Sequence, residues 1–376
     1  MTPSHASGVR LDELVRLAVD LINIPSPLYE EGEVASYVGS WLERAGLDVE
    51  YQYVSRGRPN VVAWLKGRRD EVRVMMVGHL DTFHVEGEEV RARVEGGCIH
   101  GRGSVDMKGA IAAMMLAFSD AARRQPEGTA VLGLVVDEEG KGRGSELLAK
   151  SIRAEKAIVG EPTGLSVSPA QSGLLELEIV VRGVRSHVTL PERGASAYEE
   201  LLKVLELVRL LPPLRERGPL PLMEPTAVVS LVKCGEDPWS TPRECRARVV
   251  MSLLPWHDPD ALFDEVGRAS AQLLSSGCEL LVSMVDDDMG FWLADWRDRF
   301  SSLLEAVREV VGRVSVSYMR SWCDANNLYH KGGIPTVVFG PGDLGLAHSD
   351  SERISVEELL LAARVYREVL ARELGA

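Results

Sequence analysis

Hydrophobic residues recur along the chain at two spacings, that of amphipathic helices and that of buried strands. The helical spacing predicts helices at 11–22, 30–45 and 109–122, and extended apolar runs predict strands at 48–54, 60–65, 72–77, 129–136 and 157–159. A further strand is expected at 335–339, followed by a helix to about 373 that opens with the capping box Ser355-Val356-Glu357-Glu358. Apolar strands between helices indicate an α/β domain with a mixed, largely parallel sheet flanked by helices.

The middle of the chain shows a different order of elements. It predicts a strand at 174–181, a helix at 195–211, strands at 226–232 and 247–254, a helix at 259–274 and a strand at 279–285. This β-α-β-β-α-β order is that of a ferredoxin-like fold. We therefore expect a small domain at 172–288, inserted into a larger domain that comprises 1–171 and 289–376.

Composition narrows the class of protein. Of 376 residues, 45% are hydrophobic and 26% are charged, which is ordinary for a globular protein, and no apolar stretch is long enough to span a membrane. The net charge of −14 disfavours nucleic acid and anionic lipid as partners. The first residues lack a secretory signal, and the five scattered cysteines predict neither a disulfide framework nor a thiolate zinc site. We expect a cytoplasmic protein in which histidine and carboxylate groups would hold any metal.

Candidate metal ligands follow the ends of predicted strands in the larger domain. The sequence 79–81 is His-Leu-Asp, 137–139 is Asp-Glu-Glu, a glutamate stands at 161, an aspartate at 106 lies in a glycine-rich loop, and a histidine stands at 348. Each motif alone is also compatible with a structural pair or a solvated turn. Together they match the ligand set of a two-cation hydrolytic centre, with these five groups converging on one edge of the sheet: His79, Asp106, Glu139, Glu161 and His348.

Five segments carry a resemblance to a known family. GHLDT, GRGSVDMKG, DEEG, GEPTG and GPGDLGLAHSDSE resemble, in order and spacing, the motifs of the two-zinc amidohydrolases and metallopeptidases that include acetylornithine deacetylase, succinyl-diaminopimelate desuccinylase and glutamate carboxypeptidase. The resemblance implies two divalent ions per chain, zinc or alternatively cobalt. One ion would be bound by His79 and Glu161, the other by Glu139 and His348, and both by Asp106. Asp81 would orient His79, and Glu138 would be the general base.

The same resemblance assigns roles in the inserted domain. That domain would serve as a lid and a dimerisation domain, and the histidine of the segment RGVRSH, His187, would stabilise the oxyanion, often in the partner subunit. Without the resemblance, His187 would read as a turn histidine. The outward positions of strand 174–181 and of helix 195–211 are apolar enough to predict pairing with a second copy, so we expect a homodimer.

Two features leave the substrate open. The family commonly carries Asp-x-Arg on the strand at 247–254, where the arginine holds a substrate carboxylate, but these positions are Ser252 and Leu254 here. Either another arginine serves, with Arg246, Arg248 and Arg320 as candidates, or the substrate lacks that carboxylate. Asp324 resembles part of a loop that lines the family's substrate pocket, and it is equally placed to cap a helix.

The resulting expectation is a hydrolase that cleaves the amide bond of an N-acyl amino acid, with water activated by two ions and Glu138 as the base. Two alternatives remain. One is a metallo-carboxypeptidase or dipeptidase that acts on short peptides with the same centre. The other is a non-catalytic binding protein on this fold, which would be expected to lack a ligand or the base.

Overall fold

The computed structural model describes residues 10–83, 91–124 and 126–375. It divides the chain into two compact units, the first comprising Met1–Pro169, Leu293–Ser317 and Cys323–Ala376, and the second Ala170–Trp292 with Tyr318–Trp322. The segment Tyr318–Trp322, expected in the larger domain, belongs to the second unit because Met319 exchanges backbone hydrogen bonds with Ala170 and Ser172.

The first unit is built on a six-stranded sheet in the order β1-β2-β6-β3-β7-β14. Its strands are β1 (Asp48–Ser55), β2 (Arg58–Leu65), β3 (Val72–His79), β6 (Thr129–Val135), β7 (Ala157–Val159) and β14 (Thr336–Val338). The last four in spatial order, β6 to β14, run parallel, whereas β1 and β2 are antiparallel. The predicted mixed, largely parallel sheet flanked by helices is confirmed.

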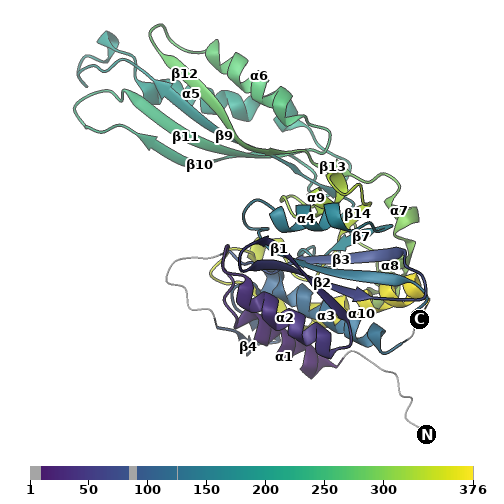
Figure 1. Cartoon of the computed structure of the whole chain (residues 1–376). Coiled ribbons are helices and arrows are strands. Elements are labelled where there is room, and N and C mark those ends of the chain that lie inside the picture. The colour runs from purple at the N-terminus through teal and green to yellow at the C-terminus, as the bar shows by residue number, and fades with distance from the viewer. Residues whose placement is uncertain (1–9, 84–90, 125, 376) are drawn as a thin grey trace. The chain divides into compact units, whose positions relative to one another are not determined.

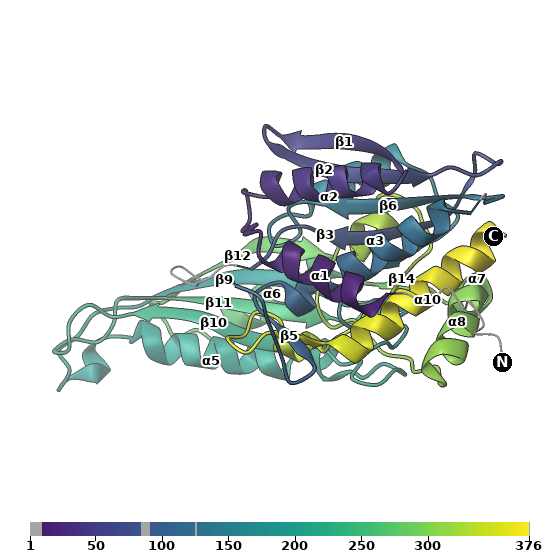
Figure 2. The same cartoon turned by 90° about the horizontal axis from the view of Figure 1, so that it is seen from below.

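Helices cover both faces of this sheet (Figure 1). On one face lie α1 (Leu11–Ile22), α2 (Gly32–Arg44), α3 (Gly109–Ala122) and α10 (Val356–Leu374), which Figure 2 shows from their own side. On the other lie α4 (Arg143–Ser151) and α9 (Ala325–His330). Helix α3 is apolar around most of its circumference and almost wholly buried, as expected for a helix packed between a sheet and other helices. The turn Ser104–Lys108, which carries Asp106, directly precedes this buried helix.

Smaller elements complete the first unit. Helices α7 (Trp296–Arg299) and α8 (Ser301–Val311) follow one another, and a three-stranded sheet is formed by β4 (Arg93–Glu95), β5 (Cys98–His100) and β15 (Arg353–Ser355). The capping box predicted at Ser355 is only half formed. The Ser355 hydroxyl accepts from the Glu358 N–H at 3.4 Å, but the Glu358 carboxylate accepts from the Gly342 N–H instead of turning back to the helix start.

The second unit has the predicted β-α-β-β-α-β order. It consists of β9 (Gly173–Arg182), α5 (Ala197–Leu210), β10 (Thr226–Cys234), β11 (Glu244–Leu253), α6 (Pro259–Ala271) and β12 (Glu279–Asp288), with the short pair β8 (Ala170–Gln171) and β13 (Phe291–Trp292) at its base. The antiparallel sheet has the order β10-β11-β9-β12. A separate apolar core joins the sheet to α5 and α6.

The outward face of this sheet differs from the expectation. Strand β9 is central, and its outward residues Glu176 and Glu178 form ion pairs with Arg248 on β11, at 2.6 and 3.3 Å. Arg246 pairs with Glu178 at 3.0 Å. The prediction of an apolar outward face on this strand was therefore wrong, because alternate positions of β9 carry charge that neighbouring strands neutralise.

The cysteines also depart from the expectation. Cys234 and Cys245 are directly opposed in the β10–β11 register, with Cα atoms 4.2 Å apart, and they form a disulfide. The expectation that the cysteines form no disulfide framework did not anticipate this single pair, since strand register is not visible in their spacing along the chain. None of the helices within the described residues is long and apolar enough to cross a membrane.

Gly340 lies where the segments that follow β14 and β7 pack closely against each other. A Cβ atom at this position, just after β14, would overlap the carbonyl oxygens of Gly160 and Glu161 at the end of β7. We predict that Gly340→Ala lowers the free energy of unfolding by about 1–3 kcal/mol, as overpacking does. The control Gly267→Ala places its methyl group in open space on α6 and should raise it by about 0.5–1 kcal/mol. Calorimetry of both variants would contradict this account if Gly340→Ala were as stable as the parent.

Candidate metal centre

The five predicted ligands meet at one edge of the first unit. They form two overlapping groups, His79–Asp106–Glu161 and Asp106–Glu139–His348, in each of which the ligand atoms lie within 4.8 Å of one another. The topology brings them together because β3, β6, β7 and β14 are parallel and end at the same edge of the sheet. Three ligands stand at or just beyond the ends of β3, β6 and β7, and the other two come from the turn before α3 and the loop after β14.

Asp106 stands between the two groups. Its Oδ1 lies 2.9 Å from Nε2 of His79, and its Oδ2 lies 3.3 Å from Nε2 of His348. His79 Nε2 is also 3.6 Å from an oxygen of Glu161, and His348 Nε2 is 3.1 Å from an oxygen of Glu139. One carboxylate therefore presents a separate oxygen to each group, which is the arrangement required to bridge two cations.

The donor set fits divalent cations. Glu161 is buried, and its Oε1 has no hydrogen-bond partner among the described residues. Burial, and then repulsion by Asp106, raises the pKa of Glu161 well above its ordinary value. Burial alone would also raise the pKa of Asp106, but hydrogen bonds from His348 and His79 lower it. Buried negative charge that two imidazoles do not balance is what a bound cation would compensate.

Asp81 braces this arrangement in two ways. Its backbone carbonyl lies 2.9 Å from Nδ1 of His79, while its carboxylate Oδ1 lies 3.8 Å from the same nitrogen. Its Oδ2 accepts the backbone N–H of Glu139 at 2.8 Å. Asp81 thus contacts both the imidazole that it was expected to orient and the backbone of a ligand from the other group.

Glu138 lies beside the two groups and belongs to neither. Its Oε2 is 4.0 Å from Nε2 of His79, and its side chain is largely buried. Burial raises the pKa of Glu138 well above its ordinary value, with repulsion from Glu161 and Asp324 adding to this against the lowering effect of His79. A carboxyl group whose proton affinity is raised next to a metal site is suited to accept a proton and return it.

Asp324 is fully buried next to these carboxylates. It makes no side-chain cap to α9, although a cap was one of the two interpretations of its sequence. Burial raises the pKa of Asp324 to about 6. Its charge also raises the pKa values of Glu138 and Glu161, so it lies within electrostatic reach of the candidate metal centre.

Other groups at the site carried no signal in the ligand pattern. Glu352 is buried and accepts the backbone N–H groups of Val105 and Asp106 at 3.1 and 3.3 Å and the Arg102 guanidinium at 2.9 Å. The Phe83 ring stacks on the imidazole of His348 with centroids 4.4 Å apart. The motif ending in HSDSE contains Glu352, but only the fold shows that it holds the turn bearing Asp106.

The remaining candidates lie in the second unit. His187 is exposed, and its Nδ1 accepts the Thr189 N–H at 3.2 Å. Leu254 is fully buried in a small apolar cluster, and the Ser252 hydroxyl donates to the backbone carbonyl of Arg320. Arg246 and Arg248 are occupied by the ion pairs of the outward face. Of the three arginine candidates, Arg320 alone forms no side-chain ion pair within the described residues.

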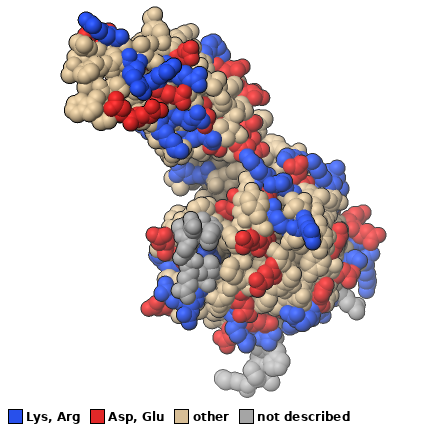
Figure 3. Space-filling model, turned by 60° about the vertical axis from the view of Figure 1, so that its left-hand side comes forward, with Lys and Arg blue, Asp and Glu red and all other residues tan. Residues whose placement is uncertain are grey.

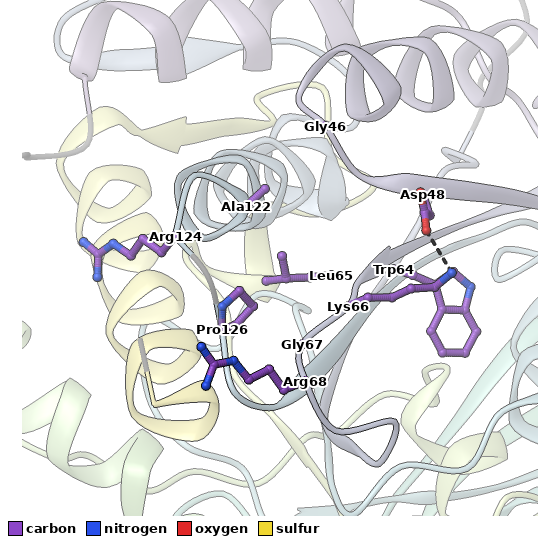
Figure 4. A pocket seen from close by; sticks show the side chains of 10 residues that line it. All are labelled: Gly46, Asp48, Trp64, Leu65, Lys66, Gly67, Arg68, Ala122, Arg124 and Pro126. Carbon is purple, nitrogen blue, oxygen red and sulfur yellow. Dashed lines mark ion pairs between the residues drawn. The ribbon is translucent and has the colours of Figure 1, made fainter.

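A hollow in the first unit contains none of the five candidate ligands. It has a volume of about 340 Å³ and is lined in part by Asp48, Lys66, Arg68 and Arg124 (Figure 4). Lys66 pairs with Asp48, and Arg68 with Glu127, all with exposed side chains. The face shown in Figure 3 likewise has basic and acidic side chains interspersed, without a continuous basic surface.

The fold and the site together define a metal-dependent hydrolase. The model of the peptidase family M20/M25/M40 matches residues 75–372, and the chain belongs to this family. A putative [LysW]-lysine/[LysW]-ornithine hydrolase of Pyrobaculum aerophilum is 31% identical over 96% of this chain and 97% of its own length. A probable carboxypeptidase of Aspergillus clavatus is 26% identical over 95% and 88%. In structure, aminopeptidase PepT of Bacillus cereus superposes with a TM-score of 0.81 at 21% identity, covering 98% of this chain and 100% of that one.

The adjacent residues Glu138 and Glu139 should differ in their effect on metal binding. We predict that Glu139→Gln weakens binding of one divalent ion, because Glu139 belongs to one of the two groups. The matched control Glu138→Gln should keep the metal content of the parent, since Glu138 lies outside both. Metal analysis after dialysis checks this, and a loss of metal from Glu138→Gln with none from Glu139→Gln would reverse the two roles.

Proposed function

We propose that this protein hydrolyses the amide bond of an N-acyl amino acid with two zinc ions, or alternatively two cobalt ions. The observation that carries the proposal is the position of Glu138, which lies 4.0 Å from His79 Nε2 and outside two ligand groups that share Asp106. Such a centre contains both a place for two cations and a separate proton acceptor. None of the expected ligands is missing, which argues against a non-catalytic binding protein.

Different residues would bind the ions and transfer the proton. His79 and Glu161 would hold one ion, Glu139 and His348 the other, and Asp106 both, with Asp81 bracing His79 and Glu139. When bound, the two ions supply Lewis-acid activation of the scissile carbonyl and of water. Glu138 takes a proton from the attacking water and delivers it to the leaving nitrogen, so that amide and water become a carboxylic acid and an amine.

His187 is proposed as the donor to the oxyanion. Nδ1 of His187 lies 3.2 Å from the Thr189 N–H and 2.8 Å from the Thr189 hydroxyl; with Nδ1 as the acceptor of both, the proton of a neutral imidazole would be on Nε2, which would then be a hydrogen-bond donor. The side chain is exposed, so this donor is open to a substrate. A hydrogen bond to the oxyanion would stabilise the tetrahedral transition state.

A homodimer is supported by the surface of the second unit. β10 is an edge strand, and Val228, Leu231 and Val232 on it are 43–56% exposed. On α5, Tyr198 and Leu202 are similarly exposed. An edge strand with an apolar surface is normally covered, and a two-fold pairing of identical subunits is the commonest solution.

A peptidase is the second candidate. The name of the Aspergillus clavatus relative supports a carboxypeptidase, whereas the name of the Pyrobaculum aerophilum relative, a putative [LysW]-lysine/[LysW]-ornithine hydrolase, supports hydrolysis of a bond to lysine or ornithine. Both reactions are hydrolyses at a carbon–nitrogen bond and would use the same centre. They differ in the group on the acyl side of the bond, which a substrate panel can identify.

Metal removal and a substrate panel test the proposal. We predict that chelation abolishes hydrolysis and that zinc or cobalt restores it, with turnover on N-acetyl, N-succinyl or LysW-linked amino acids and none on dipeptides. Glu138→Gln should keep its metal and lose about 10²–10⁴ in turnover, the range for losing a general acid–base group. Activity that survives chelation in protein free of transition metal would refute the mechanism, and cleavage of dipeptides alone would favour the peptidase.

Mixed dimers test the role of His187. We predict that His187→Ala lowers turnover by about 10²–10³, the effect of losing one oxyanion donor. Co-refolding His187→Ala with Glu138→Gln should recover part of the activity, because some sites would then combine an intact His187 from one chain with an intact Glu138 from the other. Mixtures as inactive as either parent would exclude action across subunits, as would a strictly monomeric protein.

A further inference from the structure

The turn that carries Glu138 and Glu139 begins with an unusual backbone conformation. Asp137, the first residue after the buried run that ends β6, has a φ of 75°, in the left-handed region that non-glycine residues rarely adopt. Its carbonyl accepts the N–H groups of Lys141 and Gly142 at 3.1 and 2.7 Å, which closes the turn. Such a conformation persists only where the surroundings hold it, and the direction in which Glu138 and Glu139 leave the sheet depends on it.

A buried arginine on β2 holds this turn. The carboxylate of Asp137 accepts from Arg58 Nη2 at 2.7 Å through one oxygen and from Arg143 Nε at 3.0 Å through the other. Arg58 is itself fixed by a two-pronged contact with Glu31, whose Oε2 accepts from Nε at 2.8 Å. The side chain of Arg58 is 7% exposed, and those of Glu31 and Asp137 are fully buried. A guanidinium presents several donors in a rigid plane, so one Arg58 can serve both carboxylates at defined angles.

The same strand braces the two ends of the turn. Asn60, two residues along β2 from Arg58, accepts the Val136 N–H at 3.1 Å and donates to the Gly144 carbonyl at 2.8 Å. From α9, Asn327 donates to the Gly142 carbonyl at 2.9 Å. The backbone is thus fixed on both sides of Glu138 and Glu139, and Arg58 fixes the residue directly before them.

We infer that Arg58 is a positioning residue for one of the two metal sites. By locking Asp137 it places Glu139 against His348 and Asp106, a role that rests on the two-ion centre of the proposed function. The consequence is asymmetric. Glu139 belongs to the Asp106–Glu139–His348 group and not to His79–Asp106–Glu161. Loss of the Arg58 contacts should therefore weaken binding of one ion and leave binding of the other unchanged.

A purely structural role would behave differently. Arg58 neutralises two buried carboxylates, and its loss would leave uncompensated charge that destabilises the whole unit. That effect would lower the affinity for both ions along with the melting temperature. Asymmetry between the two ions is therefore the property that distinguishes positioning from bulk stability.

The experiment is a zinc titration of apo-protein by calorimetry, with the melting temperature measured in parallel. Arg58→Lys keeps the positive charge but loses the planar set of guanidinium donors. We expect it to raise the dissociation constant of one ion by about 10–100-fold, the usual effect of removing a group that supports a metal ligand, and to leave the dissociation constant of the other ion unchanged. In a Glu139→Gln background Arg58→Lys should add nothing, whereas in a Glu161→Gln background it should add its full effect.

Two further variants separate charge from geometry. The triple variant Glu31→Gln/Arg58→Met/Asp137→Asn removes the buried charges together, and we expect a recovered melting temperature with one ion still bound weakly. Lys156→Met is the control, because it breaks another largely buried ion pair of the same unit, to Glu373 at 2.8 Å, and should lower stability without favouring one ion.

The outcomes are distinct. Equal weakening of both ions, no weakening of either, or normal affinity for both ions in the triple variant would overturn the role of Arg58 and leave the two-ion centre standing. Parent protein that binds fewer than two ions would overturn the centre itself, and the inference with it.

Discussion

Negative charge gathered at a buried edge of the sheet is the constraint around which the first unit is built. Asp106, Glu138 and Glu161 lie within about 4 Å of one imidazole nitrogen of His79, and Asp324 is buried within electrostatic reach of Glu138 and Glu161. Carboxylates in such proximity repel one another when no cation is bound. Contacts outside the cluster hold the backbone that carries part of it: Asp81 accepts the Glu139 N–H, Glu352 accepts the Asp106 N–H, and Arg58 pairs with Asp137 directly before Glu138. The ligands form the site, and these buried contacts hold the turns that carry them.

Much of the fold and most of the candidate site could be predicted from the sequence because both follow from strand ends. β3 from Val74 to Gly78, β6 and β7 are almost entirely apolar, and polar residues directly after such runs in a parallel sheet share an edge. The buried contacts that hold the turns could not be predicted in this way. Arg58 meets partners 27 and 79 residues away in the chain, and nothing in the local sequence of β2 marks it as different from a surface arginine. Pairing across such distances is visible only once the sheet order is known.

Other differences have equally physical causes. Helices α8 and α9 were not among the predicted elements. α9 has only six residues, which is too few to show a hydrophobic period, and α8 packs on α10, a contact that the sequence does not reveal. In β9 the alternation Leu-Glu-Leu-Glu does indicate one charged face, but the neutralising Arg248 lies on a strand whose register depends on an intervening helix and a long connection. The β-α-β-β-α-β order could be predicted from local patterns. Which residues would stand opposite each other could not.

The disulfide of the second unit concerns that same question of register. β10 pairs with β11 alone, carries an irregularity between Val229 and Leu231, and as an edge strand is held on one side only. A slip by one residue would exchange its inward and outward side chains. The bond between Cys234 and Cys245 joins the two strands at the start of the loop whose Ser240 pairs with His187. At this end of the sheet a covalent bond therefore fixes the β10–β11 register, which elsewhere depends on hydrophobic alternation. Because Ser240 of the adjoining loop pairs with His187, the same bond helps to fix the position of His187 within the unit.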